Sequence, residues 1–268
     1  MNKLDFGKSA LAEGLIVNEI ERVFSWVDIQ KKEIYLSDEN FSLLYKYPYP
    51  YIPSNIFYCN LKKAIVLDDH GISEFFWQDQ SIKIIYKFGA GIIPNNFRTN
   101  DGVMLSDNSF LFGTMHQHDH VKYTGSVWLL ENNQMFRIHD IHIPNSFILL
   151  KDEVLITDSY QKIIYNYSNK LKKIASVWLN YSNYKGNPDG GFYSKNKYFY
   201  LTIWGASKII KIDSKGNIIS ELILPINYPT NCKEFKNKMI ITSASILDVD
   251  KLENTNDLNG YLFITELF

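Results

Sequence analysis

The sequence has few cysteines, no surplus of either charge and no long apolar run, and each absence excludes a class of protein. Its 268 residues include only Cys59 and Cys232, too few for a disulfide framework and at no metal-ligand spacing. The 28 Lys and Arg residues nearly balance 29 Asp and Glu residues, whereas disordered tails and nucleic-acid-coating proteins carry a surplus of one sign. No stretch approaches the ~18 apolar residues of a membrane helix. We therefore expect a globular protein that binds neither nucleic acid nor a membrane.

The N-terminal segment and the missing motifs narrow this expectation. The segment MNKLDFGKSALAEG is interrupted by Asp5, Lys8 and Glu13 before the apolar part of a secretory signal can form, so we expect a cytoplasmic location. The sequence has no G-x-S-x-G motif, no P-loop and no G-x-G-x-x-G motif. Covalent serine chemistry and nucleotide binding are therefore disfavoured.

Short runs rich in Ile, Val, Phe, Tyr and Trp fill most of the chain, and Asn, Asp, Gly and Lys separate them. Amphipathic helical patterns are scarce, so the sequence predicts an all-β fold. A unit of strand, polar loop and strand recurs along the chain. The expected ends of its first strand are 40, 46, 44, 45 and 40 residues apart, at Asp28, Asp68, Thr114, Asp158, Ile203 and Ser243.

This repeat predicts a six-bladed β-propeller with four-stranded antiparallel blades, in a single domain spanning residues 1–268. A blade buries its faces only against its neighbours, and closing the ring leaves few exposed strand edges. A β-sandwich is the competing all-β fold. It predicts turn signals every 8–12 residues without the longer period, so the repeat favours the propeller.

A second set of positions recurs 13–15 residues before these markers, at Glu13, Ser54, Asn100, Asn145, Asp189 and Pro229. We expect these positions to be turns that lead into the innermost strand of each blade. In a propeller, such turns point to one mouth of the central channel. Glu13, Asn145 and Asp189 would bring two carboxylates and one amide oxygen to that mouth, the hard donors that hold a divalent cation. The alternative is that Asn and Asp simply cap tight turns through the backbone.

Arg98 precedes Asn100 by two residues, so strand alternation points both side chains the same way. A cation and an amide together could bind the hydroxyl or carbonyl groups of a ligand. An ion pair on the surface beside Asp101 is the structural alternative.

The run His116, His118 and His120 would place three imidazoles on one face of a strand, which suggests zinc. However, the string HQHDH is one residue short of the H-x-H-x-D-H spacing of binuclear zinc hydrolases. Solvent-facing or pocket-lining histidines are therefore the favoured interpretation. We expect His118 to reach the channel.

Five segments in register resemble one protein family. They are ALAEGLIVNEIERVFSWVDI, FRTNDGVMLSDNSFLFGTMH, IPNSFILLKDEVLITDSYQKIIYNY, NPDGGFYSKNKYFYLTIWGASKIIKID and LPINYPTNCKEF. Together they are similar to the regucalcin, gluconolactonase and luciferin-regenerating enzyme family from about residue 10 to residue 245. The resemblance implies a six-bladed propeller that holds one divalent cation and hydrolyses small lactones.

Residue by residue, the resemblance implies that Glu13, Asn145 and Asp189 bind the metal, with Ca, Zn, Mn and Mg all open. It implies that the Arg98, Asn100 and Asp101 of the R-x-N-D motif contact the substrate. Asp189 is the first choice for the catalytic general base and Asp101 the second. His118 is a further substrate-contacting candidate.

The sequence departs from the family pattern at four places. Leu15 replaces a usual Pro, Ser146 a usual Gly, and Val103 the Lys of animal members, while an acidic residue is missing near His118. These changes leave open a non-catalytic, metal-dependent binding propeller that has lost turnover. A protein-interaction propeller of the WD type is disfavoured because its Gly-His and Trp-Asp signatures are absent. We expect a monomer or a weak homodimer.

Overall fold

The repeat folds into six sheets in the computed structural model, which describes residues 1–89, 91–168, 171, 174–245 and 257–268. Blade 1 contains Ala12–Asn18 (β2), Val23–Asp28 (β3), Glu33–Asp38 (β4) and Leu43–Pro48 (β5), and blade 2 contains Pro53–Cys59 (β6), Lys63–Asp68 (β7), Gly71–Phe76 (β8) and Ile82–Lys87 (β9). Blade 3 contains Phe97–Ser106 (β10), Ser109–His116 (β11), Ser126–Glu131 (β12) and Gln134–His139 (β13), and blade 4 contains Pro144–Leu149 (β14), Glu153–Asp158 (β15), Ile163–Ser168 (β16) and Ile174–Asn180 (β17). Blade 5 contains Asn187–Tyr193 (β18), Phe199–Trp204 (β19), Lys208–Ile212 (β20) and Ile218–Ile223 (β21), and blade 6 contains Pro229–Phe235 (β22), Lys238–Ser243 (β23), Leu262–Glu266 (β24) and Asn2–Leu4 (β1).

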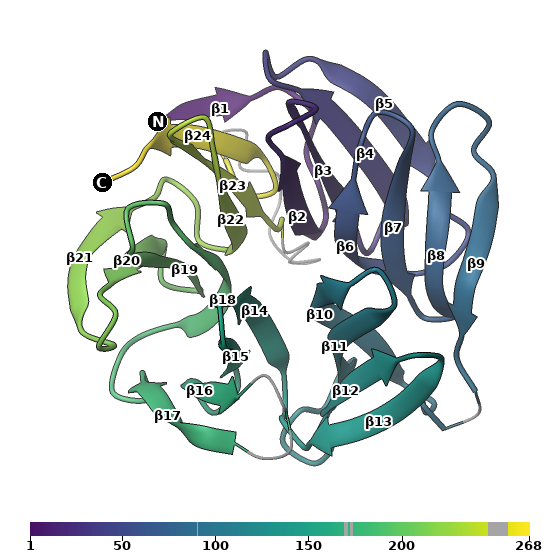
Figure 1. Cartoon of the computed structure of the whole chain (residues 1–268). Helices are drawn as coiled ribbons and strands as arrows, with labels where there is room; N and C mark the ends of the chain where they lie inside the picture. The colour runs from purple at the N-terminus through teal and green to yellow at the C-terminus, as the bar shows by residue number, and fades with distance from the viewer. Residues whose placement is uncertain (90, 169–170, 172–173, 246–256) are drawn as a thin grey trace.

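Every blade is a four-stranded antiparallel sheet, and the blades surround a central axis (Figure 1). Blades 1 to 5 use consecutive strands, whereas blade 6 has the order β1-β24-β23-β22 and joins the two ends of the chain in one sheet. The pairing of Lys3 with Phe263 therefore closes the ring by hydrogen bonds instead of a covalent link. The predicted six-bladed propeller is confirmed.

The innermost strands, β2, β6, β10, β14, β18 and β22, line the channel, and each contacts the next around the ring. Each has a register shift a few residues from its start, a bulge that turns side chains out of the regular alternation. These shifts lie between Glu13 and Ile16, Pro53 and Asn55, Thr99 and Gly102, Asn145 and Ile148, Pro188 and Gly191, and Pro229 and Cys232. The recurring positions of the sequence therefore lie at or beside bulges within the inner strands, and not in turns before them.

The recurring aspartates at the ends of the second strands have a structural role. Asp28 is buried and accepts hydrogen bonds from the backbone N–H groups of Ala10 (2.8 Å) and Leu11 (3.1 Å), just before the inner strand of the same blade. Asp158 accepts an equivalent bond from His142 (3.1 Å). Each carboxylate thus ties the entrance of an inner strand to its neighbour, which explains why the residue type repeats with the blades.

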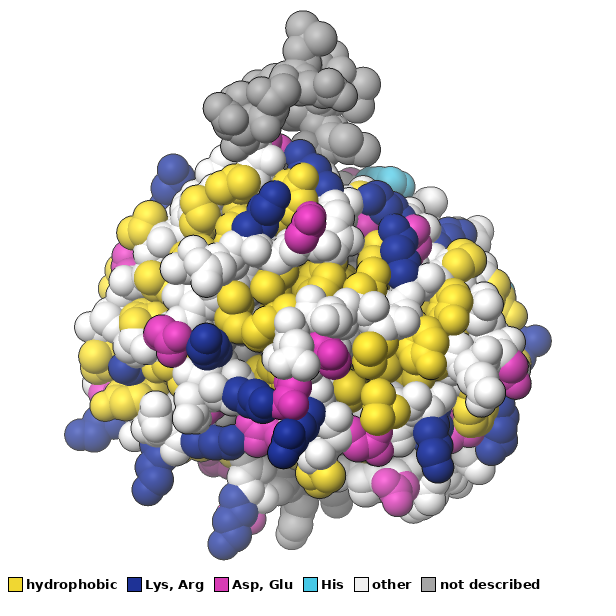
Figure 2. Space-filling model, turned by 90° about the horizontal axis from the view of Figure 1, so that it is seen from above, with side chains coloured by type: hydrophobic (Ala, Val, Ile, Leu, Met, Phe, Trp, Pro, Cys, Tyr) yellow, Lys and Arg dark blue, Asp and Glu magenta, His cyan; other side chains and the backbone are white. Residues whose placement is uncertain are grey.

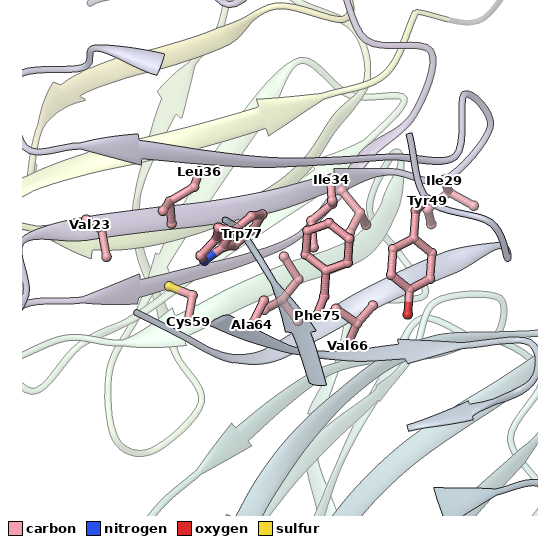
Figure 3. Packing of buried hydrophobic residues seen from close by; sticks show 12 residues of the cluster. Val23, Ile29, Ile34, Leu36, Tyr49, Cys59, Ala64, Val66, Phe75 and Trp77 are labelled. Carbon is pink, nitrogen blue, oxygen red and sulfur yellow. The ribbon is translucent and has the colours of Figure 1, made fainter. Parts of the chain in front are cut away.

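Apolar side chains fill the spaces between neighbouring blades. Figure 3 shows one such layer, where Ile34 and Leu36 of β4 lie close to Phe75, Trp77 and Val66 of blade 2. Every one of these residues is at most 1% exposed. Strand alternation sends these side chains to the blade faces while the inner-strand residues face the channel. The stabilising core and the channel are therefore separate regions of each blade.

The surface seen in Figure 2 carries Lys, Arg, Asp and Glu side chains interspersed with hydrophobic ones, so that neither sign of charge gathers there. Within the described ranges, the chain contains no helix long and apolar enough to cross a membrane.

Candidate functional site

A cavity of about 710 Å³ opens at the end of the channel where the inner strands begin, which we call the channel mouth. Glu13 of β2, Asn145 of β14 and Asp189 of β18 all line it. Three residues that are far apart in the sequence thus come together, one from each of three blades, because every inner strand enters the channel at the same end.

Asp189 has an oxygen without a protein partner. The residue is 7% exposed, and its Oδ1 is buried with no hydrogen-bond donor among the described residues. Burial raises the pKa of Asp189 well above its ordinary value, and the charges of Glu13 and Asp101 raise it further, against the opposing effect of Arg98. A buried polar atom without a partner is rare in folded proteins. The carboxylate is therefore suited to a positively charged ligand.

Glu13 shares this environment. Burial raises the pKa of Glu13 to about 8, Asp101 adds to the rise, and Arg98 and the Gly14 N–H oppose it. Like charges confined in a buried site cannot all ionise unless a cation neutralises them. Two carboxylates, one of which has an unpartnered buried oxygen, and an amide oxygen fit a divalent cation that prefers oxygen ligands.

A chain of hydrogen bonds orients the amide of Asn145. Arg98 Nη1 donates to Asn100 Oδ1 (2.6 Å), and Asn100 Nδ2 donates to Asn145 Oδ1 (2.7 Å). Asn145 Nδ2 donates in turn to Ser159 Oγ (3.0 Å). Asn100 Nδ2 also contacts the carbonyl oxygen of Pro144 (2.9 Å). Arg98 and Asn100 therefore lie on the cavity wall and fix the direction of the amide oxygen beside them.

Asp101 lies differently from its two motif neighbours. Its Oδ1 accepts a hydrogen bond from the Gly102 N–H (2.7 Å), and its Oδ2 accepts one from the Ser146 N–H (2.7 Å). The described lining of the cavity includes Arg98 and Asn100 and leaves Asp101 out. Asp101 therefore ties blade 3 to the bulge of blade 4 that follows Asn145.

The three histidines do not share a strand face. Strand β11 ends at His116, whose Nδ1 accepts backbone hydrogen bonds from His118 (3.2 Å) and Asp119 (2.9 Å), so the strand-based expectation for the run is wrong. His118 and His120 follow in the loop and both line the cavity, as expected for His118. Burial lowers the pKa of His120, and the charge of Arg98 lowers it further. His120, with a buried and unpartnered Nδ1 among the described atoms, is thus a second histidine at the mouth.

Lys233 is a charged channel residue that the sequence analysis missed. It lies on the inner strand β22, is partly buried, and donates from Nζ to the Gly191 carbonyl oxygen (2.7 Å). Burial lowers its pKa, while the charges of Asp101 and Glu13 oppose that effect. The signal that could have found it is strand alternation, because Lys233 follows the inner-strand residue Asn231 by two positions.

A second acidic group lies in the turn between β7 and β8. Asp68, Asp69 and His70 have possible ligand atoms within 4.8 Å of one another. Unlike Asp189, Asp68 has partners on both oxygens: Oδ2 accepts from Tyr49 Oη (2.8 Å), and Oδ1 from the N–H of Gly71 (2.9 Å). Its carboxylate therefore caps a turn.

Comparison with known proteins agrees with this architecture. A family model described as "SMP-30/Gluconolactonase/LRE-like region" matches residues 11–245. No curated protein sequence matches the chain. A calcium-binding regucalcin from Agrobacterium tumefaciens has a TM-score of 0.86 at 18% identity, covering 98% of this chain and 92% of that one. A luciferin-regenerating enzyme has a TM-score of 0.84 at 18% identity, covering 97% of this chain and 92% of that one. A gluconolactonase from Xanthomonas campestris has a TM-score of 0.73 at 14% identity, covering 98% of this chain and 90% of that one. At these identities the structural likeness establishes the propeller fold.

Proposed function

Because the chain belongs to the SMP-30/gluconolactonase/LRE-like family, we propose that it is a hydrolase of small lactones that depends on one divalent cation. Family membership supports a lactonase-type function. The observation that carries the metal dependence is the buried, unpartnered Oδ1 of Asp189 on the wall of the same cavity as Glu13 and Asn145. These three residues would hold the cation, and Ca, Mg, Mn and Zn all suit sites that contain carboxylate oxygens.

Asp189 is the proposed general base. When bound, the cation supplies Lewis-acid polarisation of the lactone carbonyl and a lower pKa for a bound water. Asp189 accepts a proton from the attacking water while the oxygen of that water bonds to the carbonyl carbon. The ring C–O bond then breaks, and the proton passes to the leaving alkoxide, so a hydroxy acid is formed. Next to the cation the carboxylate would stay ionised and able to accept a proton, and the lowered pKa of the bound water would carry much of the activation.

The other residues of the mouth orient and stabilise the substrate. Arg98 can donate from its remaining guanidinium N–H groups to the carbonyl or hydroxyl oxygens of a lactone. Asn100, whose amide hydrogens donate to Asn145 and Pro144, can accept from a hydroxyl through Oδ1. His118 and His120 lie on the same wall, where their imidazoles can form hydrogen bonds with the oxygen atoms of a lactone. Asp101, with both oxygens held by backbone N–H groups, is better suited to positioning the Asn145 bulge than to proton transfer.

The cavity wall is mixed in character, which guides the choice of substrates. Besides the polar groups, it includes the apolar side chains Ile52, Met115, Ile143 and Trp204. Apolar walls favour the hydrocarbon part of a ligand, whereas the polar groups fix its oxygen atoms. A test panel therefore needs both polyhydroxylated sugar lactones and apolar or aromatic lactones.

The test is lactone hydrolysis followed by proton release with a pH indicator. Chelator treatment is expected to abolish activity with the best lactone of the panel, and Ca²⁺, Mg²⁺, Mn²⁺ or Zn²⁺ to restore it. Glu13→Ala should lose activity, whereas the matched surface variant Glu131→Ala, whose side chain is exposed, should keep it. Full activity in the chelated protein or in Glu13→Ala would contradict the metal-dependent mechanism.

The same experiment distinguishes the alternative of a binding propeller without turnover. Ser146, which follows the proposed ligand Asn145, adopts a left-handed backbone conformation with φ of 50°. Such a conformation is strained for a residue other than glycine, and strain there can displace a ligand. Calcium-dependent binding of lactones with no hydrolysis across the panel would favour this alternative.

A further inference from the structure

Five charged groups of the channel act on one another electrostatically. Three are the carboxylates of Glu13, Asp101 and Asp189, and two are the cations of Arg98 and Lys233, which both act on Glu13. Arg98 interacts with Glu13 and Asp189. Lys233 interacts first with Asp101 and then with Glu13. If all five are ionised, the group carries a net charge of −1, from three negative and two positive side chains.

Lys233 is near enough to the cluster of Glu13, Asn145 and Asp189 for its charge to act on it, but it does not line the cavity. Its Nζ is fixed by the hydrogen bond to the Gly191 carbonyl oxygen (2.7 Å), two residues beyond Asp189 on β18. Among the described residues, the lining of the mouth cavity includes Glu13 and Asp189 and leaves Lys233 out. A partly buried charge is weakly screened by salt, and its effect reaches several ångströms.

We propose that Lys233 is a built-in positive charge that lowers the affinity of the Glu13, Asn145 and Asp189 cluster for a divalent cation. This inference rests on the proposed function. When all of these groups are ionised, the channel carries −1 with Lys233 and would carry −2 without it, which matches a divalent cation in charge. The lysine therefore makes cation binding weaker and more readily reversible than the ligand set alone would make it.

The experiment measures cation affinity directly, without an activity assay. Chelator-treated protein is titrated with CaCl₂ and with MnCl₂ by calorimetry. Lys233→Gln keeps a donor for the Gly191 carbonyl and removes the charge, and Lys233→Met removes both. Both neutral variants are expected to lower the Kd by at least about tenfold, because a unit charge acts strongly on a dication in a partly buried site.

Two controls separate charge from structure. Lys233→Arg keeps the positive charge and should retain the wild-type Kd within about threefold, which a purely structural role for the lysine would not predict. Lys62→Met makes the same charge change at an exposed position on blade 2 and should leave the Kd unchanged.

The outcomes distinguish failure of this inference from failure of the proposed function. An unchanged or higher Kd in the neutral variants overturns the role of Lys233 and leaves the metal site in place. Failure of both neutral variants to fold, with Lys233→Arg folded, also overturns it and makes Lys233 a stabilising counter-ion. Absence of cation binding in the wild type and in all variants overturns the metal-dependent function, and this inference with it.

Discussion

Two groups of acidic side chains in this propeller have similar compositions and different surroundings. The Asp68 group lies in a turn of blade 2, and backbone N–H groups and the Tyr49 hydroxyl satisfy its buried carboxylate. The channel group of Glu13 and Asp189 lines a cavity and includes an oxygen with no donor among the described residues. Both contain carboxyl groups whose pKa is raised by burial. The unsatisfied oxygen of Asp189, rather than carboxylate density or a raised pKa, therefore distinguishes the channel group as the candidate ligand site.

The largest expected effect comes from replacing one aspartate in each group by asparagine, which exchanges a carboxylate for an amide. Asp189→Asn should lower kcat/KM for a lactone by about 10²–10⁴-fold, because it removes the proposed proton acceptor. Calcium affinity should fall by at least about tenfold, because a charged ligand is lost. Kinetics of proton release and calorimetry measure the two effects.

Asp68→Asn is the matched control for that exchange. It should lower the free energy of unfolding by about 1–3 kcal/mol, since it replaces a buried acceptor of several hydrogen bonds. Its calcium Kd should stay at the wild-type value. A loss of calcium binding in Asp68→Asn, with Asp189→Asn unaffected, would reverse the assignment of the two groups.

A smaller effect is expected on the pH dependence of stability. In the cation-free protein, the pKa of Glu13 is about 8 against 4.5 ordinarily, so the folded state holds a proton that the unfolded state releases. The stabilisation from this group is complete below the ordinary pKa and is lost as pH rises to about 8. Asp68, with a pKa of about 6, loses its contribution over a lower range. Between pH 6 and pH 8, the free energy of unfolding should therefore fall because of the channel group.

Urea denaturation at three pH values tests this separation. Glu13→Gln should flatten the decline between pH 6 and pH 8, and saturating Ca²⁺ should flatten it in the wild type. Asp68→Asn should leave the decline in that range intact. A decline that is the same in Glu13→Gln and in the wild type would show that other groups cause it.

The two groups also show how far sequence reasoning reaches. The length of the blade repeat and the position of the inner strand within it depend on strand alternation and chain length. Both can be seen in the spacing of Asp28, Asp68 and Asp158. The same repeat predicted that Glu13 and Asp189 lie at the channel mouth, because equivalent positions of inner strands meet at one end of the channel. The blade repeat places all of these residues without any knowledge of their partners.

The remaining features depend on local departures from alternation. Asp101 follows Asn100 directly, yet the bulge sends it to the backbone of Ser146 instead of to the mouth. His118 leaves the strand because β11 ends at His116. Strand alternation can place Lys233 on the inner strand, but its partner is a carbonyl oxygen of another blade, which the sequence does not identify. Bulges, strand ends and backbone partners are tertiary features, and a periodic pattern does not encode them.

The smallest expected effect concerns backbone strain, which also differs between the two groups. Ser146, beside Asn145, has φ of 50°, whereas none of the residues from Asp68 to Gly71 has a positive φ. Its buried hydroxyl has no partner among the described residues. Ser146→Gly should raise the free energy of unfolding by about 0.5–1 kcal/mol, because relief of the ~1–2 kcal/mol left-handed penalty exceeds the entropy that glycine loses on folding.

Lys197→Gly is the control, because Lys197 has a similar φ of 65° in an exposed turn of blade 5. Both variants should gain comparable stability in urea denaturation, but only Ser146→Gly should change the calcium Kd, since Ser146 adjoins the proposed ligand. If Ser146→Gly destabilises the protein while Lys197→Gly stabilises it, the Ser146 side chain supports the bulge and strain is not the difference between the two groups. If both variants gain stability and the calcium Kd stays constant, the Asn145 amide is positioned by the Arg98–Asn100 hydrogen bonds rather than by the backbone of the bulge.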